Sequence, residues 1–593
     1  MRRDIEGQVA VGMSDGWKNI KRDALLASLL SVHYKTYTVN VHDLSARRKT
    51  ADNHLKLVLN DIDYVEKEYK VRVIAWVSDA GGDSRAMRIN LIVGDILKLS
   101  SELVEAAEQA IDIIRWLLNH SYLLGLFHEE QLRITGTTHT LNLPVITQWT
   151  SHFLLFNSLT SESRPLRSLL VTRPEAFQAS AGRSPELAQQ VQVIMRNIED
   201  TKFWQKLMEL KIYLEPLAIA ANVAQAATTR LDHILIELGR LYYTFSRFAT
   251  NATIRTCVLN SLELRWGKSD QDPFILAVVL NPYIRTGVFS TQNSLLNRTS
   301  LYGAAKRVFR RLFRKDSDLG MYGAFMDYLD GRNEFHPDRW DFQELRASFE
   351  QISQPVDLIG VWTGLLLSDL GNVGRQQLVH LAINVLSIIA NSAGCERLFS
   401  EMGHIQSKRR ARLSNQKTFD TAVVRMELKR KHAAAGLTRA RLHRQFGLQA
   451  TKEAGPLFPE AEKQDQHDET AEELAEVDVE EESAAYQIKE LANKLAQDVI
   501  DDEDPPEDNA DDDSHLGVRP PTGTLPKQVR LFFGTQYPIL LKDLFNYSAP
   551  DLEGHGLNIF KSAGLSNLQK ELEAYDLLTR EMQKPTMTDG FDD

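Results

Sequence analysis

The hydrophobic periodicity of the chain changes near residue 90, and this change constrains the fold more than any other feature of the 593 residues. Before it, short apolar or β-branched runs at Val9–Met13, Leu25–His33 and Thr36–Val41 are typical of strands separated by polar turns. A helical pattern starts at Thr50, and the continuous apolar run Val71–Val77 predicts a strand buried on both faces. Such a strand favours a parallel return after the helix, so the chain is expected to begin as an α/β sheet.

From about residue 90 to residue 349, apolar residues recur every three or four positions, which is the spacing of amphipathic helices. The runs that show this spacing are Leu103–Leu118, Leu187–Leu214, Leu231–Phe248 and Gly303–Phe313. A further helical block extends from Val356 to about Arg430. Near the C-terminal end, a short apolar stretch at Tyr537–Phe545 and a predicted helix at Leu565–Met582 are candidates for packing against the body.

The formal net charge of −11 combines two opposite regions. Residues 460–513 hold 23 Asp and Glu against three Lys, a local charge of −20, so the rest of the chain carries +9. Just before them, His404–Arg444 holds twelve Lys and Arg against two acids. A like-charge run of this length cannot collapse, so residues 436–530 are predicted to form an acidic, mostly disordered linker. Ala484–Val499 has helical spacing and predicts a short helix within it.

Several protein classes are excluded by composition. The two cysteines, Cys257 and Cys395, supply neither a disulfide framework nor a Cys-rich zinc site, which points to a reducing compartment. The N-terminal residues lack the apolar stretch of a signal peptide. The longest apolar candidate, Leu378–Ala393, is interrupted by polar residues and is short for a bilayer span. We therefore expect neither a membrane nor a secreted protein.

Three acids are candidate metal ligands. Asp15 and Asp79 each close a predicted strand, in MSDGW and VSDAGGD. Carboxylates at neighbouring parallel strand ends can converge on Mg²⁺. Two bound Mg²⁺ ions can activate a water molecule and stabilise the leaving oxygen of a phosphodiester. The alternative is that Asp ends strands because it favours turns. Glu396, in IIANSAGCERLFSEMG, is either a third ligand or half of a surface ion pair with Arg397.

The segment NSAGCERLFSEMGHIQSKRRARLS (391–414) resembles the C-terminal dimerisation region of hAT-type transposases. That family shows a Ser/Ala-rich turn, then Glu-Arg, Phe-Ser, a Gly and a Lys/Arg-rich stretch ending in Arg-Leu-Ser, and each of these is present. Upstream of this segment, five weaker matches occur in the same order as in the family: DGW (15–17), SDAGGDSRAMR (78–88), TQW (147–149), FILAVVLNP (274–282) and PVDLIGVW (355–362). The resemblance extends from about residue 8 to about residue 432.

The resemblance implies an α/β ribonuclease-H-like core interrupted by a large all-α insertion. Residues 1–95 and 351–435 would form the core, the latter with the dimerisation region, residues 96–350 the insertion, and residues 531–593 a C-terminal segment with a predicted helix. Asp15, Asp79 and Glu396 match the family's Asp-Asp-Glu site, which binds Mg²⁺ or Mn²⁺. Trp149 matches a tryptophan that stacks on a flipped base, and its alternative role is a core anchor.

Two departures from the family pattern point to a decayed member. Gln148 stands where the family usually has Arg. More importantly, Met87-Arg88 runs directly into Ile89, so a helix, a strand and a Cys-x-x-His segment that follow the second Asp in the family are missing. Losing a strand beside Asp79 would loosen a metal geometry that tolerates little displacement. The zinc-finger DNA-binding domain of the family is also expected to be absent, as two cysteines require.

The basic stretch is the best nucleic-acid feature. Lys408, Arg409, Arg410 and Arg412 are close enough in sequence for several salt-sensitive phosphate contacts, with a nuclear-localisation signal or a solvated helix face as alternatives. The acidic linker is a candidate competitor for the same arginines. A stripe at helical spacing is expected to be core or, as in the family, to support subunit association: Leu378, Leu381, Val385, Ile388, Ile389, Leu398 and Phe399.

The resulting prediction is a hAT-transposase-like protein that dimerises and binds DNA, decayed or truncated, without its zinc finger. One alternative is an active Mg²⁺-dependent enzyme of DNA cleavage and strand transfer. Another is a host-adopted nuclear interaction protein with a vestigial site. Expected partners are a second copy and DNA, with no membrane and no small-molecule substrate, and the expected location is nuclear or cytoplasmic.

Overall fold

The computed structural model describes residues 5–46, 51–78, 89–139, 141, 149–225, 229–247, 251–340, 342–351, 356–367, 371–406, 410, 412–434 and 538–547. In these residues the protein is mostly helical and contains one small mixed sheet of four strands. The acidic run 460–513 and the helices predicted at Ala484–Val499 and Leu565–Met582 lie outside the described residues.

The sheet follows from the alternating N-terminal sequence. Its elements are β1 (Val9–Lys18), β2 (Ala24–Val32), β3 (Lys35–Asp43), α2 (Ala51–Tyr69) and β4 (Arg72–Ser78). The strand order is β3-β2-β1-β4; β1, β2 and β3 pair antiparallel, and β4 pairs parallel with β1 after the α2 crossover. The predicted three strands, helix and parallel return are confirmed.

The prediction that the VRVIAWV strand is buried on both faces is wrong. β4 has a strand partner on one side only within the described sheet, and its residues are half-buried or exposed. The strand that is buried along its whole length is β2, because it lies between two strands and is covered on both faces. Asp15 also does not close its strand, since β1 continues to Lys18.

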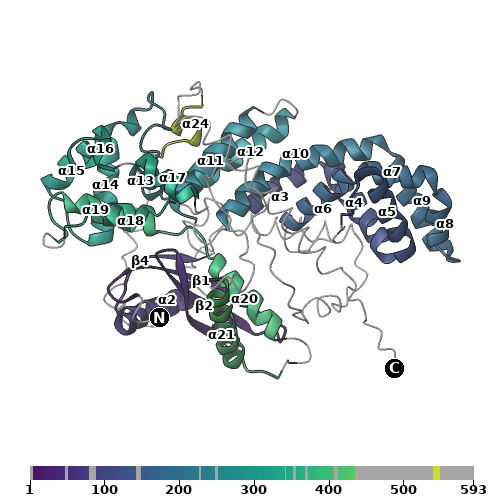
Figure 1. Ribbon diagram of the computed structural model, residues 1–593, viewed down its shortest axis with the longest axis horizontal. Coiled ribbons are helices and arrows are strands. Elements are labelled where there is room, and N and C mark those ends of the chain that lie inside the picture. The colour runs from purple at the N-terminus through teal and green to yellow at the C-terminus, as the bar shows by residue number, and fades with distance from the viewer. Residues whose placement is uncertain are drawn as a thin grey trace, which may run out of the picture.

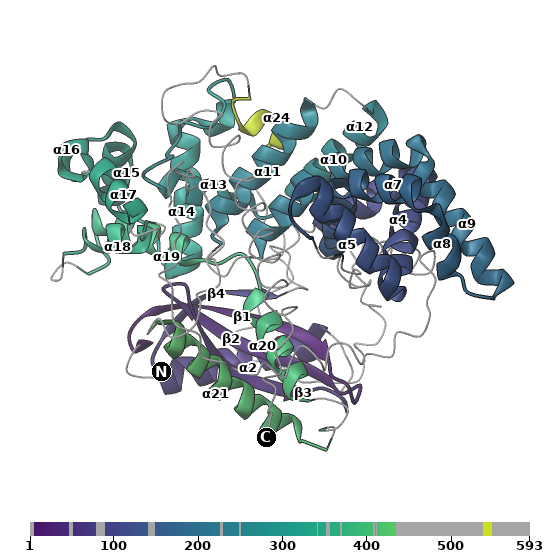
Figure 2. The ribbon, with the colours of Figure 1, turned by 45° about the vertical axis from the view of Figure 1, so that its right-hand side comes forward.

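Helices cover both faces of the sheet (Figure 2). On one face, α20 (Ala393–Ile405) and α21 (Asn415–Ala434) pack on apolar side chains that include Met13 and Leu29. On the other face, Val65 of α2 joins a smaller apolar cluster with Leu30. We call β1–β4, α2, α20 and α21 the sheet unit. It therefore combines the first eighty residues with helices that follow more than 300 residues later.

The remaining helices form what we call the helical body, which spreads above the sheet unit in Figure 1. The elements of its N-terminal half are α3 (Ile89–Leu99), α4 (Ser101–Asn119), α5 (Ser121–Thr135), α6 (Trp149–Ser161), α7 (Ser163–Thr172), α8 (Pro174–Ser180), α9 (Pro185–Glu199), α10 (Thr201–Ala224) and α11 (Leu231–Ser246). The others are α12 (Ala252–Gly267), α13 (Gln271–Leu280), η2 (Ser294–Leu296), α14 (Arg298–Phe313), α15 (Leu319–Asp330), η3 (Asn333–Phe335), α16 (Pro337–Trp340), α17 (Phe342–Gln351), α18 (Leu358–Thr363), α19 (Gln376–Ser387) and the distant α24 (Leu541–Leu544).

One predicted helix proves to be two. The run Leu187–Leu214 is divided into α9 and α10, because Asp200 adopts an extended conformation between them. Its carboxylate accepts a hydrogen bond from the backbone N–H of Lys202, which caps α10. Of the two C-terminal segments that were candidates for packing against the body, the short apolar stretch does so: Ile539 and Phe545 belong to its core.

The apolar core of the helical body is continuous from α3 to α19. It includes Leu378, Leu381 and Val385, which are completely buried, so this part of the apolar stripe is core within one chain. α19 thus contributes to the core of the helical body; it lies in the range 351–435 that we predicted as the C-terminal part of the ribonuclease-H-like core and the dimerisation region. No helix in the described part of the chain is long and apolar enough to cross a membrane.

A buried polar junction joins the two parts. Arg230, which precedes α11, makes two bonds of 2.9 and 2.8 Å to the carboxylate of Asp232. Tyr34 of the β2–β3 turn donates its hydroxyl to the carbonyl of Leu386 at 2.6 Å. Burial alone would raise the pKa of Asp232, but the positive charge of Arg230 holds it at about 2. The pair therefore stays charged between the sheet unit and the helical body.

Candidate functional site

Asp15 lies on the face of β1 that α20 covers. Side chains alternate along a strand, so Asp15 shares this face with Met13 and Trp17, both of which pack against the α20 cluster. Asp15 is half-buried, and its Oδ1 accepts a hydrogen bond of 2.7 Å from the backbone N–H of Gly16. The carboxylate therefore reaches the surface beside an apolar face.

Glu396 is in the first turn of α20, and its side chain is exposed. The next residue back, Cys395, has its Sγ 3.9 Å from the carbonyl oxygen of Ala27, and Ala27 is the register partner of Asp15. One turn later, Phe399 stacks on Trp17 with ring centroids 5.4 Å apart. The first turn of α20 consequently lies over the part of the sheet that carries Asp15.

The close approach of α20 depends on a glycine. A Cβ atom at Gly394 would lie 2.8 Å from Met13 Sδ and 3.1 Å from Thr36 Cγ2, which is closer than side chains normally pack. This position, two residues before Glu396, sets how near the helix comes to the sheet.

The third predicted ligand, Asp79, lies outside the described residues. The residue before it, Ser78, ends β4 and is in parallel register with Ser14, the residue before Asp15. In the part of the chain that the structure describes, no group of three His, Cys, Asp or Glu side chains is placed to hold a metal ion. The structure thus brings Asp15 and Glu396 onto one face without describing a complete ligand set.

The basic stretch is only partly described: Lys408 and Arg409 lie outside it, whereas Arg410 and Arg412 are exposed. The chain just after them is hydrogen-bonded to the turn between β1 and β2 and to the end of β3. Asn415 donates to the carboxylates of Asp23 at 3.1 Å and Asp43 at 2.9 Å. Lys21 donates to the carbonyl of Leu413 at 2.5 Å. The two arginines are therefore held at the same end of the sheet as Lys18 of β1.

Two other basic residues of this region form ion pairs within the chain. Arg425 and Lys429 on α21 pair with Glu401 on α20, at 2.8 and 2.9 Å. Their spacing of four places both on one helix face, which is the signal that sequence reasoning missed. Trp149 is the first residue of α6 in the helical body, and its side chain lies outside the described part.

A second polar group on β1 was not predicted. Ser14 Oγ is 3.3 Å from His54 Nε2 on α2 and accepts a hydrogen bond of 3.0 Å from Trp76 Nε1. Burial lowers the pKa of His54, which favours the neutral imidazole. Ser14 is completely buried, and the group acts as a tie between the sheet and α2 rather than as an accessible nucleophile.

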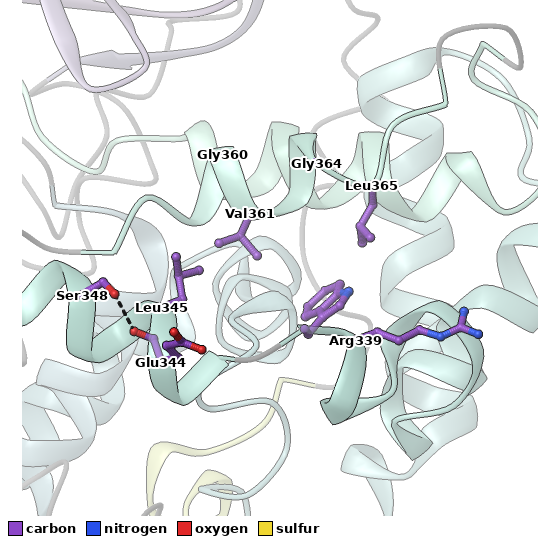
Figure 3. A pocket seen from close by; sticks show the side chains of 9 residues that line it. Arg339, Glu344, Leu345, Ser348, Gly360, Val361, Gly364 and Leu365 are labelled. Atoms are coloured by element: carbon purple, nitrogen blue, oxygen red, sulfur yellow. Dashed lines mark hydrogen bonds between the residues drawn. The ribbon is translucent and has the colours of Figure 1, made fainter.

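An open groove of about 570 Å³ lies between α16, α17 and α18. Figure 3 shows Val361 and Leu365 on one wall, and Leu345 and Arg339 on the other. None of the predicted site residues lines it. The candidate site is the surface where the first turn of α20 meets β1.

No protein-family model matches the chain, and no curated protein matches it.

Proposed function

We propose that this chain is a hAT-transposase-like protein, with a ribonuclease-H-like core and an all-α insertion, that self-associates, binds DNA and has lost efficient catalysis. One observation carries the proposal: α20, which follows α3–α19 in sequence, packs its first turn, with Glu396, over the part of the sheet that holds Asp15. The mixed sheet β3-β2-β1-β4, in which β4 pairs parallel with β1 after a helix, is consistent with the α/β core of the proposal.

The donor chemistry of the described part fits a divalent cation. Asp15 and Glu396 are carboxylates, which Mg²⁺ and Mn²⁺ prefer, and they come from two elements that meet. A bound cation would supply activation of water towards a phosphodiester. The role of the chain itself would be to hold the two carboxylates on a rigid strand and helix.

A nicking assay tests the catalytic part of the proposal. The purified full chain is incubated with short duplexes and Mn²⁺ and compared with its Asp79→Ala and Glu396→Gln variants. Asp420→Asn removes an exposed acid from α21 and is the control. A decayed protein gives no nicking above the level of the two variants. Nicking that both variants lose and the control keeps would instead support the active enzyme.

DNA binding is proposed at Arg410 and Arg412, which are exposed. Each phosphate contact contributes about 0.9 to the slope of log affinity against log salt. Arg410→Gln/Arg412→Gln should therefore lower that slope by about 2 in a fluorescence titration with duplex DNA. Arg425→Gln is the matched control, because Arg425 is engaged by Glu401. Equal slopes for the double variant and the unaltered chain would contradict this assignment.

Self-association is proposed through the outer face of α21. Val424 and Leu428, one turn apart, are 58% and 47% exposed. The apolar stripe of α19 is already buried within the chain and cannot serve. Val424→Ser/Leu428→Ser should abolish any dimer seen by light scattering, whereas Leu319→Ser, at an 82% exposed leucine of the helical body, should leave it intact. A dimer that survives the double change would place the interface elsewhere.

A further inference from the structure

The segment 538–547 lies against the helical body, far along the chain from the residues it contacts. It packs beside α11, α12 and the loop before η2, and Figure 1 shows its helix α24 next to α11 and α12. Residues 435–537, which separate it from the end of α21, lie outside the described part. This contact is therefore made by ten residues at the end of a long connection.

The helical body recognises the main chain of this segment with side chains. Trp266 Nε1 and Gln271 Nε2 both donate to the carbonyl of Ile539, at 2.7 and 3.0 Å. Gln271 Oε1 accepts from the N–H of Ile539 at 2.8 Å. Glu263 accepts the N–H groups of Leu541 and Lys542 at 2.7 and 2.8 Å. Trp266 and Gln271 are completely buried, so these donors and acceptors form a built site.

Backbone pairing continues past α24. The N–H of Ser290 donates to the carbonyl of Leu544 at 2.9 Å, and the N–H of Asn546 donates to Val288 at 3.0 Å. Phe545 stacks on Phe289 with ring centroids 5.8 Å apart. The body thus pairs with an extended stretch as a sheet edge does, which is how many domains bind linear peptides.

Apolar anchors supply the specificity. Leu541 and Leu544 are completely buried and Phe545 is 2% exposed, whereas Lys542 and Asp543 between them are exposed. Main-chain bonds with a few side-chain pockets are the pattern of peptide recognition, in contrast to the continuous interdigitation of helices elsewhere in this body. Opposing these contacts is the entropy of ordering ten residues on a long tether.

We propose that the surface formed by Glu263, Trp266, Gln271 and the backbone of residues 288–290 is a peptide-docking groove, and that residues 538–547 of this chain are its detachable occupant. Docking fixes both ends of the connection 435–537, because residue 434 ends α21 of the sheet unit and residue 538 begins the segment on the helical body. Because that connection contains the −20 run 460–513, the groove determines whether this acidic run is held near the body or released from it.

The first experiment is peptide binding to the full chain carrying Leu541→Asp/Leu544→Asp, which frees the groove. The probe is a fluorescein-labelled peptide of residues 538–547, followed by anisotropy. We expect saturable binding, weakened at least tenfold by Gln271→Leu in the full chain or by Leu544→Ala in the peptide. Lys542→Ala in the peptide is the matched control and should bind unchanged. No saturable binding up to about 1 mM, the upper range of concentration that a flexible tether supplies, would overturn the proposal.

A second experiment needs no substitution in the groove or the segment. A protease site is placed between residues 514 and 530 of the full chain, and the chain is cleaved. We expect the C-terminal fragment to co-elute with the body and to be displaced by excess unlabelled peptide of residues 538–547. Release without competitor, or retention that excess peptide does not change, would overturn the proposal. Failure of the Leu541→Asp/Leu544→Asp chain to fold would also overturn it, because the segment would then be an integral part of the core.

Discussion

The sheet unit and the helical body are held together in different ways. The helical body has one continuous apolar core, to which helices that follow one another in sequence contribute. The sheet unit has two thin apolar clusters, one on each face, and the larger one is complete only with α20 and α21. Between them, the buried pair Arg230–Asp232 lies next to Tyr34 of the sheet unit. The candidate site thus depends on contacts between the sheet and helices far along the chain. Its position relative to the helical body depends on the polar junction.

The junction pair gives the largest expected effect. Arg230→Met leaves the carboxylate of Asp232 buried without its cation, and breaking a buried pair in this way costs about 3–5 kcal/mol. We expect that loss in the free energy of urea unfolding, measured by circular dichroism. The double variant Arg230→Met/Asp232→Leu should recover much of it, since neither charge is then buried alone. Equal losses for the single and double variants would show that packing, not charge, holds the junction.

The same junction predicts a pH dependence. Burial lowers the pKa of His233 to about 3, whereas an unfolded histidine titrates near 6.5. Below about pH 6.5 the unfolded state binds a proton that the folded state does not, so the stabilisation is full above that pH and falls as the pH decreases toward 3. From pH 7 to pH 5 the loss attributable to His233 is about 2 kcal/mol. His233→Gln should remove that part of the slope in urea unfolding, and an unchanged slope would contradict the assignment.

The packing of α20 on the sheet is tested by two glycines of the same helix. Gly394→Ala would place a Cβ 2.8 Å from Met13 Sδ, and overpacking of this kind costs about 1–3 kcal/mol. At Gly403 the nearest atom would be Trp17 Cζ2 at 3.8 Å, so Gly403→Ala should stabilise by about 0.5–1 kcal/mol through helix propensity. Opposite signs in thermal unfolding would confirm that only the first turn, next to Glu396, is tightly packed.

The smallest change in the free energy of unfolding is expected at an exposed ion pair that has the same bidentate geometry as the buried Arg230–Asp232 pair. Arg430 on α21 binds Glu427 through two bonds of 2.8 and 2.6 Å, as Arg230 binds Asp232, yet both side chains are about half exposed. Arg430→Met should change the free energy of unfolding by less than about 0.5 kcal/mol. A cost comparable to that of Arg230→Met would mean that geometry rather than burial determines the value of these pairs.

Local periodicity predicted the strands and most of the helices, because it depends on neighbours in sequence. It failed at Leu187–Leu214, where the apolar spacing continues through a break set by the capping carboxylate of Asp200. It also assigned the fully buried strand to β4 rather than β2, because burial depends on what covers a strand. Asp15 and Glu396 were noted separately as candidate ligands, and only a resemblance predicted that they share one site, since no spacing connects residues nearly 400 positions apart. The Tyr34 and Arg230 junction had no sequence signal for the same reason.

The separation between the sheet and its covering helix has a consequence for synthesis on the ribosome. β3 ends at Asp43 and α20 begins at Ala393, so roughly 350 residues are translated between them. At a translation rate of about 5–20 residues per second, the apolar face of β1 and β2 stays uncovered for on the order of 20–70 s before α20 is synthesised. During that time the nascent chain exposes Met13, Leu25 and Leu29 to solvent or to a chaperone. Assembly of the surface that carries Asp15 therefore cannot be completed before α20 has left the ribosome.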